Sequence, residues 1–497
     1  MAKVLVIGSG MGGMACAARL ASKGHRVTVV EQSDTWGGKL GLVRHGEHVF
    51  DTGPSLFTLP AVYRDLFLKT GAPLEDSIEI VDLETAFRYQ FSDGTVLKMP
   101  GVGIGKCADA IGDCLGGDSA DQWRSFMKRA ADMWAVTRKP FLESELNGMK
   151  SLLSMAWRVN DIKTIAPFAT LREITEKYIS DPRLITLVDR YATYTGSDPR
   201  KAPAALATVP YIEQMFGAYH ISGGVRELGR ALFERCEKLG IEFRFNTSLE
   251  NISATSRVNG ATSSNGEFFA ADIVVANADA ANVYEHLLPK SSATKSARNS
   301  LAKSTPSLSG FVLLFALSGT TPGLEHHNVY FPADYENEFD SVFGFAGPKR
   351  PVQDPTVYIC APKDSKMSPT GTESWFTLIN APRHEPDSGV DWNDSTLISS
   401  YRDHVIGTLG SRGLNFEERI SWEQVITPAD LETRTYAPGG SIYGTSSNGV
   451  RSAFLRPQNV TAIENLYLVG GSSHPGGGLP LVGMSAEIVA NHIGRAS

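Results

Sequence analysis

The first 31 residues place two short apolar runs around a glycine-rich turn and a helix-compatible segment. Residues 4–7 are wholly apolar, residues 14–23 suit a helix, and residues 27–30 form a second apolar run that ends at Glu31. Short apolar runs bounded by turn residues are typical of buried strands in a parallel sheet. This stretch therefore predicts a strand, a turn, a helix and a second strand, in that order.

The rest of the chain carries both strand and helix periodicity. Over 86–99, aromatic residues alternate with polar ones before an Asp93-Gly94 turn, which predicts a β-hairpin. From about 108 to 187, apolar residues recur at helical spacing, as in helices that pack one face into a core. Further strands are predicted over 241–245, 273–276, 310–317, 357–360, 375–379 and 465–469, and helices over 225–239 and 484–493. The pattern indicates an α/β protein.

The first turn has the spacing of a dinucleotide-binding loop. Gly8, Gly10 and Gly13 would allow the tight turn, the close approach of a pyrophosphate and the packing of helix on strand. The helix N-terminus offers free N–H groups to phosphates, and an acid at Glu31 can bind an adenosine ribose. The alternative is a glycine-rich turn in an ordinary α/β domain, but the strand, helix and acid around it favour dinucleotide binding. The predicted contacts are Gly8, Gly10, Met11, Gly12, Gly13 and Glu31.

Three later loops carry related chemistry. Gly37-Gly38-Lys39 adds backbone N–H groups and an ammonium beside the same phosphates. Gly53-Pro54-Ser55 is either a surface turn or, as we prefer, a loop that returns to the cofactor. Near the C-terminus, a strand, a glycine loop and a helix follow one another again, and this loop contains Gly470, Gly471, His474, Gly477, Gly478 and Leu479.

Composition narrows the class of protein. A chain of 497 residues predicts two or three domains, and a formal charge of −7 with a pI near 5.9 argues against nucleic-acid binding. Five scattered cysteines without a C-x-x-C pair indicate reduced thiols and no zinc site. We expect no signal peptide, and no apolar run approaches the ~20 residues of a membrane-spanning helix.

The adjacent histidines His326-His327 invite a metal-site interpretation. Neighbouring residues of a strand point to opposite faces of the sheet, so the two imidazoles should not share one ion. No acid or cysteine at ligand spacing accompanies them in the sequence. We therefore expect no metal at this pair.

Together these motifs resemble the amine-oxidase and carotenoid-desaturase superfamily of flavoproteins. The resemblance implies that the dinucleotide is FAD, that Glu31 holds the adenosine ribose and that Lys39, where arginine is commoner, lies near the pyrophosphate. It also implies a strand beside the adenine, at Leu249, and places Asn277 and the loop Gly477-Gly478-Leu479 next to the flavin.

The resemblance further implies a discontinuous organisation. Residues 1–60, 220–300 and 455–497 would form a Rossmann-type FAD-binding domain. Residues 61–219 and 301–454 would form an inserted α+β substrate domain, with a helical and membrane-associating part at about 108–187.

Two segments narrow the resemblance to bacterial phytoene-desaturase-type enzymes. Residues 190–204 look like their substrate region, with Arg190 and Tyr194 as candidate substrate contacts. Pro480-Leu481-Val482 is more similar to the hydroxycarotenoid 3,4-desaturase branch. The implied activity is oxidation of a CH–CH group in a linear carotenoid such as phytoene or a 1-hydroxycarotenoid, with oxygen or a quinone as electron acceptor. His474 either contacts the reacting centre or only shapes the turn at Pro475.

An apolar C40 substrate would have to be collected from a bilayer. The stretch 149–168 combines bulky apolar residues with cations, as interfacial helices do. We expect a cytoplasmic protein held at the inner face of the membrane. A related carotenoid oxygenase or isomerase, an amine oxidase and a non-enzymatic isoprenoid escort protein remain alternatives, and the sequence leaves the carotenoid, the number of steps and the oligomeric state open.

Overall fold

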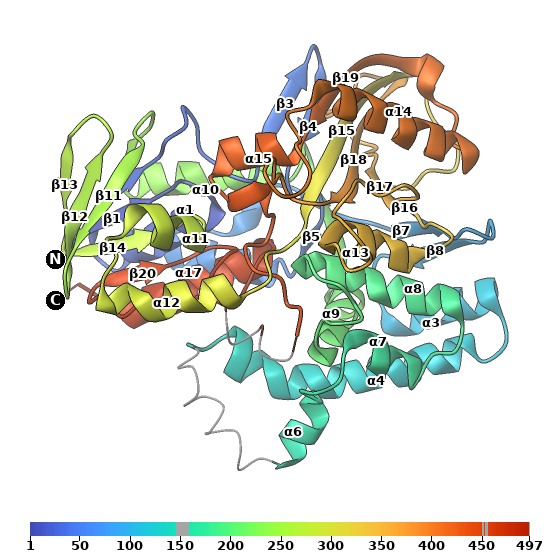
Figure 1. Cartoon of the computed structure of the whole chain (residues 1–497), viewed down its shortest axis with the longest axis horizontal. Coiled ribbons are helices and arrows are strands. Elements are labelled where there is room, and N and C mark those ends of the chain that lie inside the picture. The colour runs from blue at the N-terminus through green and yellow to red at the C-terminus, as the bar shows by residue number, and fades with distance from the viewer. Residues whose placement is uncertain (146–158, 450–451, 453–455, 497) are drawn as a thin grey trace.

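The computed structural model describes residues 1–145, 159–449, 452 and 456–496. Its N-terminal strand lies inside a five-stranded sheet with the order β10-β2-β1-β14-β20 (Figure 1). All four strand pairings are parallel. The strands are β1 (Lys3–Ile7), β2 (Arg26–Val30), β10 (Glu242–Arg244), β14 (Ile273–Ala276) and β20 (Leu466–Leu468). Three distant parts of the chain thus build one sheet.

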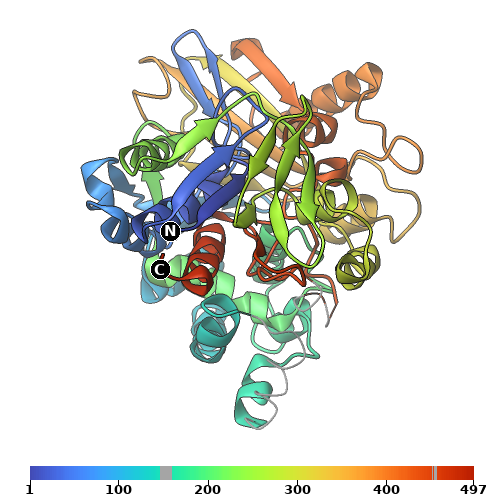
Figure 2. The same cartoon turned by 90° about the vertical axis from the view of Figure 1, so that its left-hand side faces the viewer.

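Layers cover both faces of this sheet. Side chains of β1 and β2 that point to one face join a core with α1 (Met11–Ser22), α10 (Arg226–Lys238) and α17 (Leu479–Ile493). Alternate side chains, including Leu5 and Val30, pack on the other face against a three-stranded sheet, which Figure 2 shows from the side. That sheet consists of β11 (Leu249–Ala254), β12 (Val258–Ser263) and β13 (Phe268–Ala270). The predicted α/β fold, with its parallel dinucleotide-type sheet, is confirmed.

A second, seven-stranded sheet has the order β19-β15-β18-β17-β16-β7-β8. Its strands are β7 (Thr85–Gln90), β8 (Val96–Pro100), β15 (Ser309–Ser318), β16 (His327–Tyr330), β17 (Val357–Cys360), β18 (Thr372–Ala381) and β19 (Ile420–Ile426). The predicted hairpin over 86–99 and the strands over 310–317, 357–360 and 375–379 all belong to it. One face packs on α14 (Ser395–Ser411), and the other carries Val312, Tyr358 and Phe376 towards a cavity.

The predicted helical region is confirmed in the part of the chain that the structure describes. It comprises α3 (Ile104–Leu115), α4 (Ser119–Thr137), α6 (Val159–Ile165), α7 (Leu171–Glu176) and α8 (Pro182–Arg190), followed by α9 (Thr208–Phe216). Residues 149–158 of the predicted interfacial stretch lie outside the described residues. None of the described helices has the length and apolar character that crossing a bilayer requires.

The remaining elements are short. They are the strands β3 (Leu42–His45), β4 (His48–Asp51), β5 (Phe57–Thr58), β6 (Ile80–Asp82) and β9 (Ala218–Ile221), and the helices α2 (Ala61–Thr70), α11 (Ala280–Asn282), α12 (Ser292–Lys303), α13 (Tyr335–Phe343) and α15 (Pro428–Thr435). The two chain ends lie near each other in Figures 1 and 2, and the Ala496 N–H donates to the Lys23 carbonyl at 3.0 Å.

Two helix boundaries differ from the prediction. The first helix begins at Met11 instead of residue 14, because glycines at 12 and 13 let helical backbone start directly at the turn. The last helix begins at Leu479 instead of residue 484, and Pro480 occupies its first turn, a position that proline suits. Both changes bring helix N-termini closer to the glycine loops. The exact domain boundaries stay a prediction.

Candidate functional site

One cavity of about 770 Å³ starts where the order of the parallel sheet reverses, between the ends of β1 and β14. Such a switch point is where open α/β sheets bind ligands. Its lining contains almost all the residues predicted from the sequence: Gly8, Gly10, Met11, Gly12, Glu31, Gly37, Gly38, Lys39, Gly53, Pro54, Ser55, Arg190, Tyr194, Leu249, Asn277, Gly470, Gly471, His474, Gly477, Gly478 and Leu479. Gly13 lies just behind, where the helix meets the strand.

The first turn leaves no room for side chains. Gly8 has a φ of 91°, in the left-handed region, and a Cβ at Gly13 would lie 2.1 Å from the Gly8 carbonyl oxygen. The N-terminus of α1 is capped by Gly10 without a side-chain hydrogen bond, and its first turn holds no acid. Its N–H groups are therefore available to an anion from the cavity, as the loop spacing predicts.

Glu31 is buried and held by four hydrogen bonds. The Ser9 N–H and hydroxyl donate to Oε2 at 2.7 and 2.8 Å, and the Ser33 N–H and hydroxyl donate to Oε1 at 3.0 and 2.9 Å. A carboxylate offers about four acceptor positions. A ribose hydroxyl would therefore bind by displacing a serine hydroxyl, which can rotate away.

Two cations line the cavity near this end. The Lys39 ammonium donates to the carbonyls of Ser441 and Ile442 at 3.0 and 2.6 Å, so it also anchors that loop, and burial lowers its pKa. Arg434, which the sequence analysis missed, donates from Nη1 to Thr52 at 3.1 Å. Its buried Nε and Nη2 have no hydrogen-bond partner among the described residues. Arg434 lines the cavity, and a guanidinium group with donors to spare suits a diphosphate.

Side chains from outside the C-terminal glycine loop, residues 470–479, hold that loop in place. Tyr443 packs so closely that a Cβ at Gly477 would lie 2.3 Å from its ring, and Arg456 donates to the carbonyls of Gly471 and Tyr443. His474 is buried, and its Nε2 lies 3.0 Å from the Ser144 carbonyl oxygen. Burial lowers the pKa of His474 to about 4, so its ring is neutral at neutral pH. These contacts favour the loop-shaping role for His474.

A polar cluster lies within the otherwise apolar part of the lining. Arg190 donates to the Tyr194 hydroxyl at 2.9 Å, and the Tyr191 and Tyr194 hydroxyls lie 2.6 and 3.4 Å from Glu213. The Arg190 guanidinium also lies 5.0 Å from the ring centre of Phe87. Burial raises the pKa of Glu213, while Arg190 opposes that rise. Glu213 was not predicted, because a single glutamate in a helix carries no motif.

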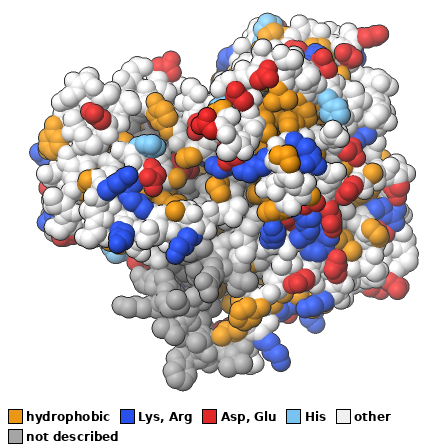
Figure 3. All heavy atoms as spheres, viewed as in Figure 1, with side chains coloured by type: hydrophobic (Ala, Val, Ile, Leu, Met, Phe, Trp, Pro, Cys, Tyr) orange, Lys and Arg blue, Asp and Glu red, His pale blue; other side chains and the backbone are white. Residues whose placement is uncertain are grey.

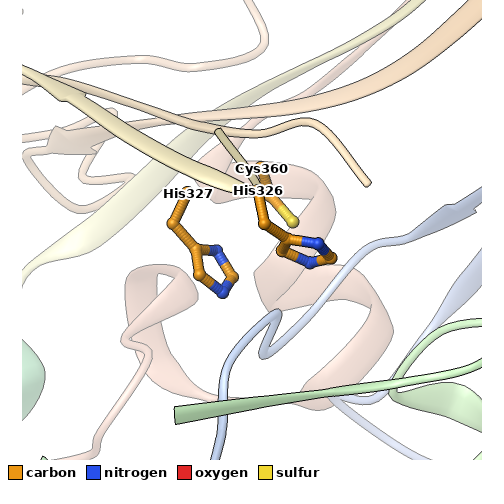
Figure 4. A group of neighbouring side chains, drawn as sticks. All are labelled: His326, His327 and Cys360. Carbon is orange, nitrogen blue, oxygen red and sulfur yellow. The ribbon is translucent and has the colours of Figure 1, made fainter. Parts of the chain in front are cut away.

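The argument against a shared site at His326 and His327 is wrong. Residue 326 precedes the first residue of β16, so strand alternation does not govern its side chain. The two rings lie 4.5 Å apart, centre to centre, and both are close to Cys360 (Figure 4).

A switch-point cavity lined by a glycine loop, a buried acid at the end of the second strand and two cationic side chains is typical of a dinucleotide-dependent enzyme. The chain belongs to the flavin-containing amine oxidoreductase family, which matches residues 11–494. The predicted flavin oxidoreductase class and the FAD cofactor are confirmed. The glycine cradle and the unpaired guanidinium donors of Arg434, a residue of the cavity lining, fit FAD.

Curated relatives cover the whole chain. A 1-hydroxycarotenoid 3,4-desaturase of Flavobacterium sp. (strain P99-3) is 34% identical, with 99% of both chains covered. A 4,4'-diapolycopene oxygenase of Methylomonas sp. is 31% identical, with 99% of this chain and 98% of that protein covered. A 4,4'-diapophytoene desaturase of Staphylococcus aureus (strain MRSA252) is 28% identical over the same shares. The resemblance to carotenoid desaturases is thereby confirmed.

Solved structures share the fold. An oxidoreductase from Methanosarcina mazei superposes with a TM-score of 0.62 at 15% identity, covering 98% of this chain and all of that one. Putrescine oxidase with bound putrescine gives a TM-score of 0.64 at 11% identity, covering 99% and 98%. At these identities the likeness concerns the fold alone.

Proposed function

We propose that the protein is an FAD-dependent desaturase of a linear carotenoid, with a 1-hydroxycarotenoid as the favoured substrate. The observation that carries this proposal is the continuity of the cavity. A glycine-rich dinucleotide end opens into a lining of apolar side chains that include Phe87, Leu206, Val209, Ile212, Val312, Phe376 and Leu378. A polyene can lie there with its apolar surface removed from water.

The chain's contribution to the reaction is mainly positioning. Bound FAD supplies the two-electron acceptor for the loss of two hydrogens from neighbouring carbons. The apolar walls hold the polyene extended and exclude water, and Tyr443 and Arg456 fix the loop on which the cofactor end rests. No nucleophilic residue is needed for this chemistry.

The polar cluster of Arg190, Tyr194 and Glu213 supports the hydroxylated substrate. These side chains lie in the lining itself, where a plain hydrocarbon would leave their polar atoms facing carbon. In a 1-hydroxycarotenoid the hydroxyl oxygen is three bonds from C3, so its recognition site must lie close to the bond being oxidised. A site built to bond a hydroxyl group rejects an analogue that lacks it.

We also propose that the enzyme works at the cytoplasmic face of the membrane, with oxygen or a quinone as the final acceptor. Phe168, just after α6, is 84% exposed, and Ile165 and Pro167 line the cavity. Figure 3 shows exposed hydrophobic side chains at the lower end of the molecule, where α6 lies in Figure 1. Apolar groups at a cavity edge would let substrate pass from lipid into the site.

The test is turnover in liposomes containing phytoene, a 1-hydroxycarotenoid or a diapocarotenoid, with purified FAD-loaded protein. A product two hydrogens lighter, with a red-shifted polyene spectrum, from the hydroxylated substrate is the expected result. A product that gains oxygen from the diapocarotenoid would replace the proposal with an oxygenase, the activity named for the Methylomonas relative. Flavin binding without change in any polyene would refute both.

A further inference from the structure

A second group of side chains, with nitrogen and sulfur atoms that can bind a metal ion, lies outside the lining of the main cavity. His326, His327 and Cys360 are all buried and lie close together where β16 begins and β17 ends (Figure 4). We propose that these three side chains form a binding site for a thiophilic closed-shell metal ion, Zn(II) or Cu(I). The established family membership assigns no role to them, and the site does not depend on the carotenoid proposal.

The fold brings the three residues together through strand pairing. His327 and Cys360 are direct partners in the antiparallel β16–β17 ladder, so their side chains lie on the same face. Just before β16, the carbonyl of His326 accepts a hydrogen bond from the Ala361 N–H at 2.8 Å, which holds residue 326 beside the end of β17. The His326 ring meets the His327 ring edge to face. The sequence analysis did not identify this group of three residues, because Cys360 lies 33 positions after the nearer histidine.

The separations suit one ion. One ligand atom from each residue lies within 4.8 Å of the other two. Around a tetrahedral or trigonal ion with bonds of about 2.0–2.3 Å, ligand atoms lie about 3.5 Å apart. Small rotations of three side chains close that difference without moving the strands.

The hydrogen bonds leave one nitrogen of each imidazole without a partner. Nε2 of His326 and Nε2 of His327 are buried and have no hydrogen-bond partner among the described residues. A buried nitrogen without a partner is unfavourable, and a metal ion would satisfy both.

The opposite nitrogen of one imidazole is held in the way metal ligands are held. Nδ1 of His327 lies 2.7 Å from the Tyr358 hydroxyl, which lies 2.7 Å from the Ser55 hydroxyl. With the proton on Nδ1, His327 donates to Tyr358 and keeps the lone pair of its unpartnered Nε2 available to an ion. Metal-binding histidines commonly donate their second N–H in this manner. Since Ser55 and Tyr358 line the main cavity, the chain also links the two sites.

The chemistry of the set selects the ion. Two neutral imidazoles and one thiolate prefer thiophilic or borderline ions over Mg²⁺ or Ca²⁺. Binding forms a metal–sulfur bond and releases the thiol proton to solvent, with no change of oxidation state.

The surrounding charges distinguish the two candidate ions. Cu(I) with one thiolate is neutral, whereas Zn(II) leaves one positive charge in a buried place. One carboxylate near the cluster is Asp364, which lies 2.9 Å from Nε2 of His220, and the His220 ring is 4.5 Å from the His326 ring. Rotation of His220 would supply Zn(II) with a fourth ligand.

The first experiment is metal analysis of the FAD-loaded protein. Protein expressed with added Zn(II) or Cu(I), then dialysed against a weak chelator, should retain about one ion per chain by elemental mass spectrometry. Cys360→Ser should lose it, and the matched control Cys107→Ser, another buried cysteine, should keep it. The element retained decides between the two ions.

Cobalt supplies an independent optical readout. Co(II) added to the chelated protein should produce a thiolate-to-cobalt charge-transfer band, absent in Cys360→Ser and weakened in His326→Gln. Flavin content and thermal unfolding report whether each variant is folded. Wild-type protein that is folded, holds flavin, retains no ion and gives no cobalt band would overturn the proposal, as would a band that persists in Cys360→Ser. Neither outcome touches the proposed desaturase activity, because no carotenoid enters the assay.

Discussion

The two ends of the main cavity are built in different ways. The cofactor end uses backbone from three glycine loops, at 8–13, 37–39 and 470–479, and the first and last of them join a strand to a helix. The substrate end uses single side chains, such as Phe87 on β7, Glu213 on α9 and Tyr358 on β17. A site built from backbone constrains consecutive residues, so it leaves a local pattern in the sequence. A site built from single side chains on different elements leaves no such pattern.

The largest effect should follow from filling the first glycine turn. In Gly13→Val, the new Cβ would lie 2.1 Å from the Gly8 carbonyl oxygen, a distance that no side-chain rotation relieves. We expect loss of bound FAD by at least about 100-fold, since α1 can no longer pack on β1 at the phosphate position. Flavin absorbance per mole of purified protein measures this.

Gly105→Ala is the matched control, because a Cβ there meets nothing within 4 Å and the position is helical. It should keep full flavin and gain slightly in stability, since alanine favours helix. Full flavin in Gly13→Val would mean that the cofactor end is not built from this turn.

Removing the unpaired guanidinium should weaken FAD binding without loss of fold. Arg434→Met deletes the two donors that have no partner among the described residues. Hydrogen bonds to a charged group contribute about 1.5–3 kcal/mol, so FAD affinity should fall about 10- to 100-fold. Titration of the apoprotein with FAD, followed by flavin fluorescence, gives the dissociation constant.

Two further variants test whether a loss of FAD affinity in Arg434→Met is specific to this guanidinium group. Arg434→Lys should recover part of the affinity, because it keeps the charge and loses the fork. Arg230→Met removes a cation of α10 that pairs with Glu227 and Glu234, donates to the Ser77 carbonyl and does not line the cavity, so this variant should bind FAD normally. Equal dissociation constants for Arg434→Met and Arg230→Met would remove Arg434 from the cofactor site.

At the substrate end, Glu213→Gln should alter substrate preference while leaving FAD binding unchanged. The amide keeps the size of the carboxyl group but loses its charge and part of its accepting capacity. We expect the ratio of kcat/KM for hydroxylated over non-hydroxylated carotenoid to fall about tenfold. An equal loss for both substrates would contradict hydroxyl recognition and indicate proton transfer at Glu213 instead.

The same contrast explains what the sequence could predict. The parallel sheet, the hairpin and every loop of the cofactor end were predictable, because apolar runs and glycine spacing are local signals. Arg434 escaped prediction because its role depends on α15 lying beside Thr52, 382 residues away in sequence. The histidine–cysteine cluster escaped for the same reason, and there strand alternation was applied to a residue that lies one position outside the strand.

The smallest expected effect concerns the contact that ties the cofactor loop to the helical part. His474 is buried, and its pKa of about 4 lies below the usual value of 6.5. As pH falls below 6.5 the unfolded chain takes up a proton at this residue and the folded protein does not, so stability present above pH 6.5 is lost progressively down to about pH 4. Between pH 7 and 5.5 this loss in the free energy of unfolding amounts to about 1 kcal/mol.

Urea unfolding at several pH values measures this dependence. His474→Gln should remove this contribution to the pH dependence of the free energy of unfolding, whereas His286→Gln, at an exposed position, should leave the contribution in place. Identical slopes in the two variants would mean that the His474 ring is exposed to solvent in the folded protein and that the loop is held by its backbone contacts and Arg456 alone.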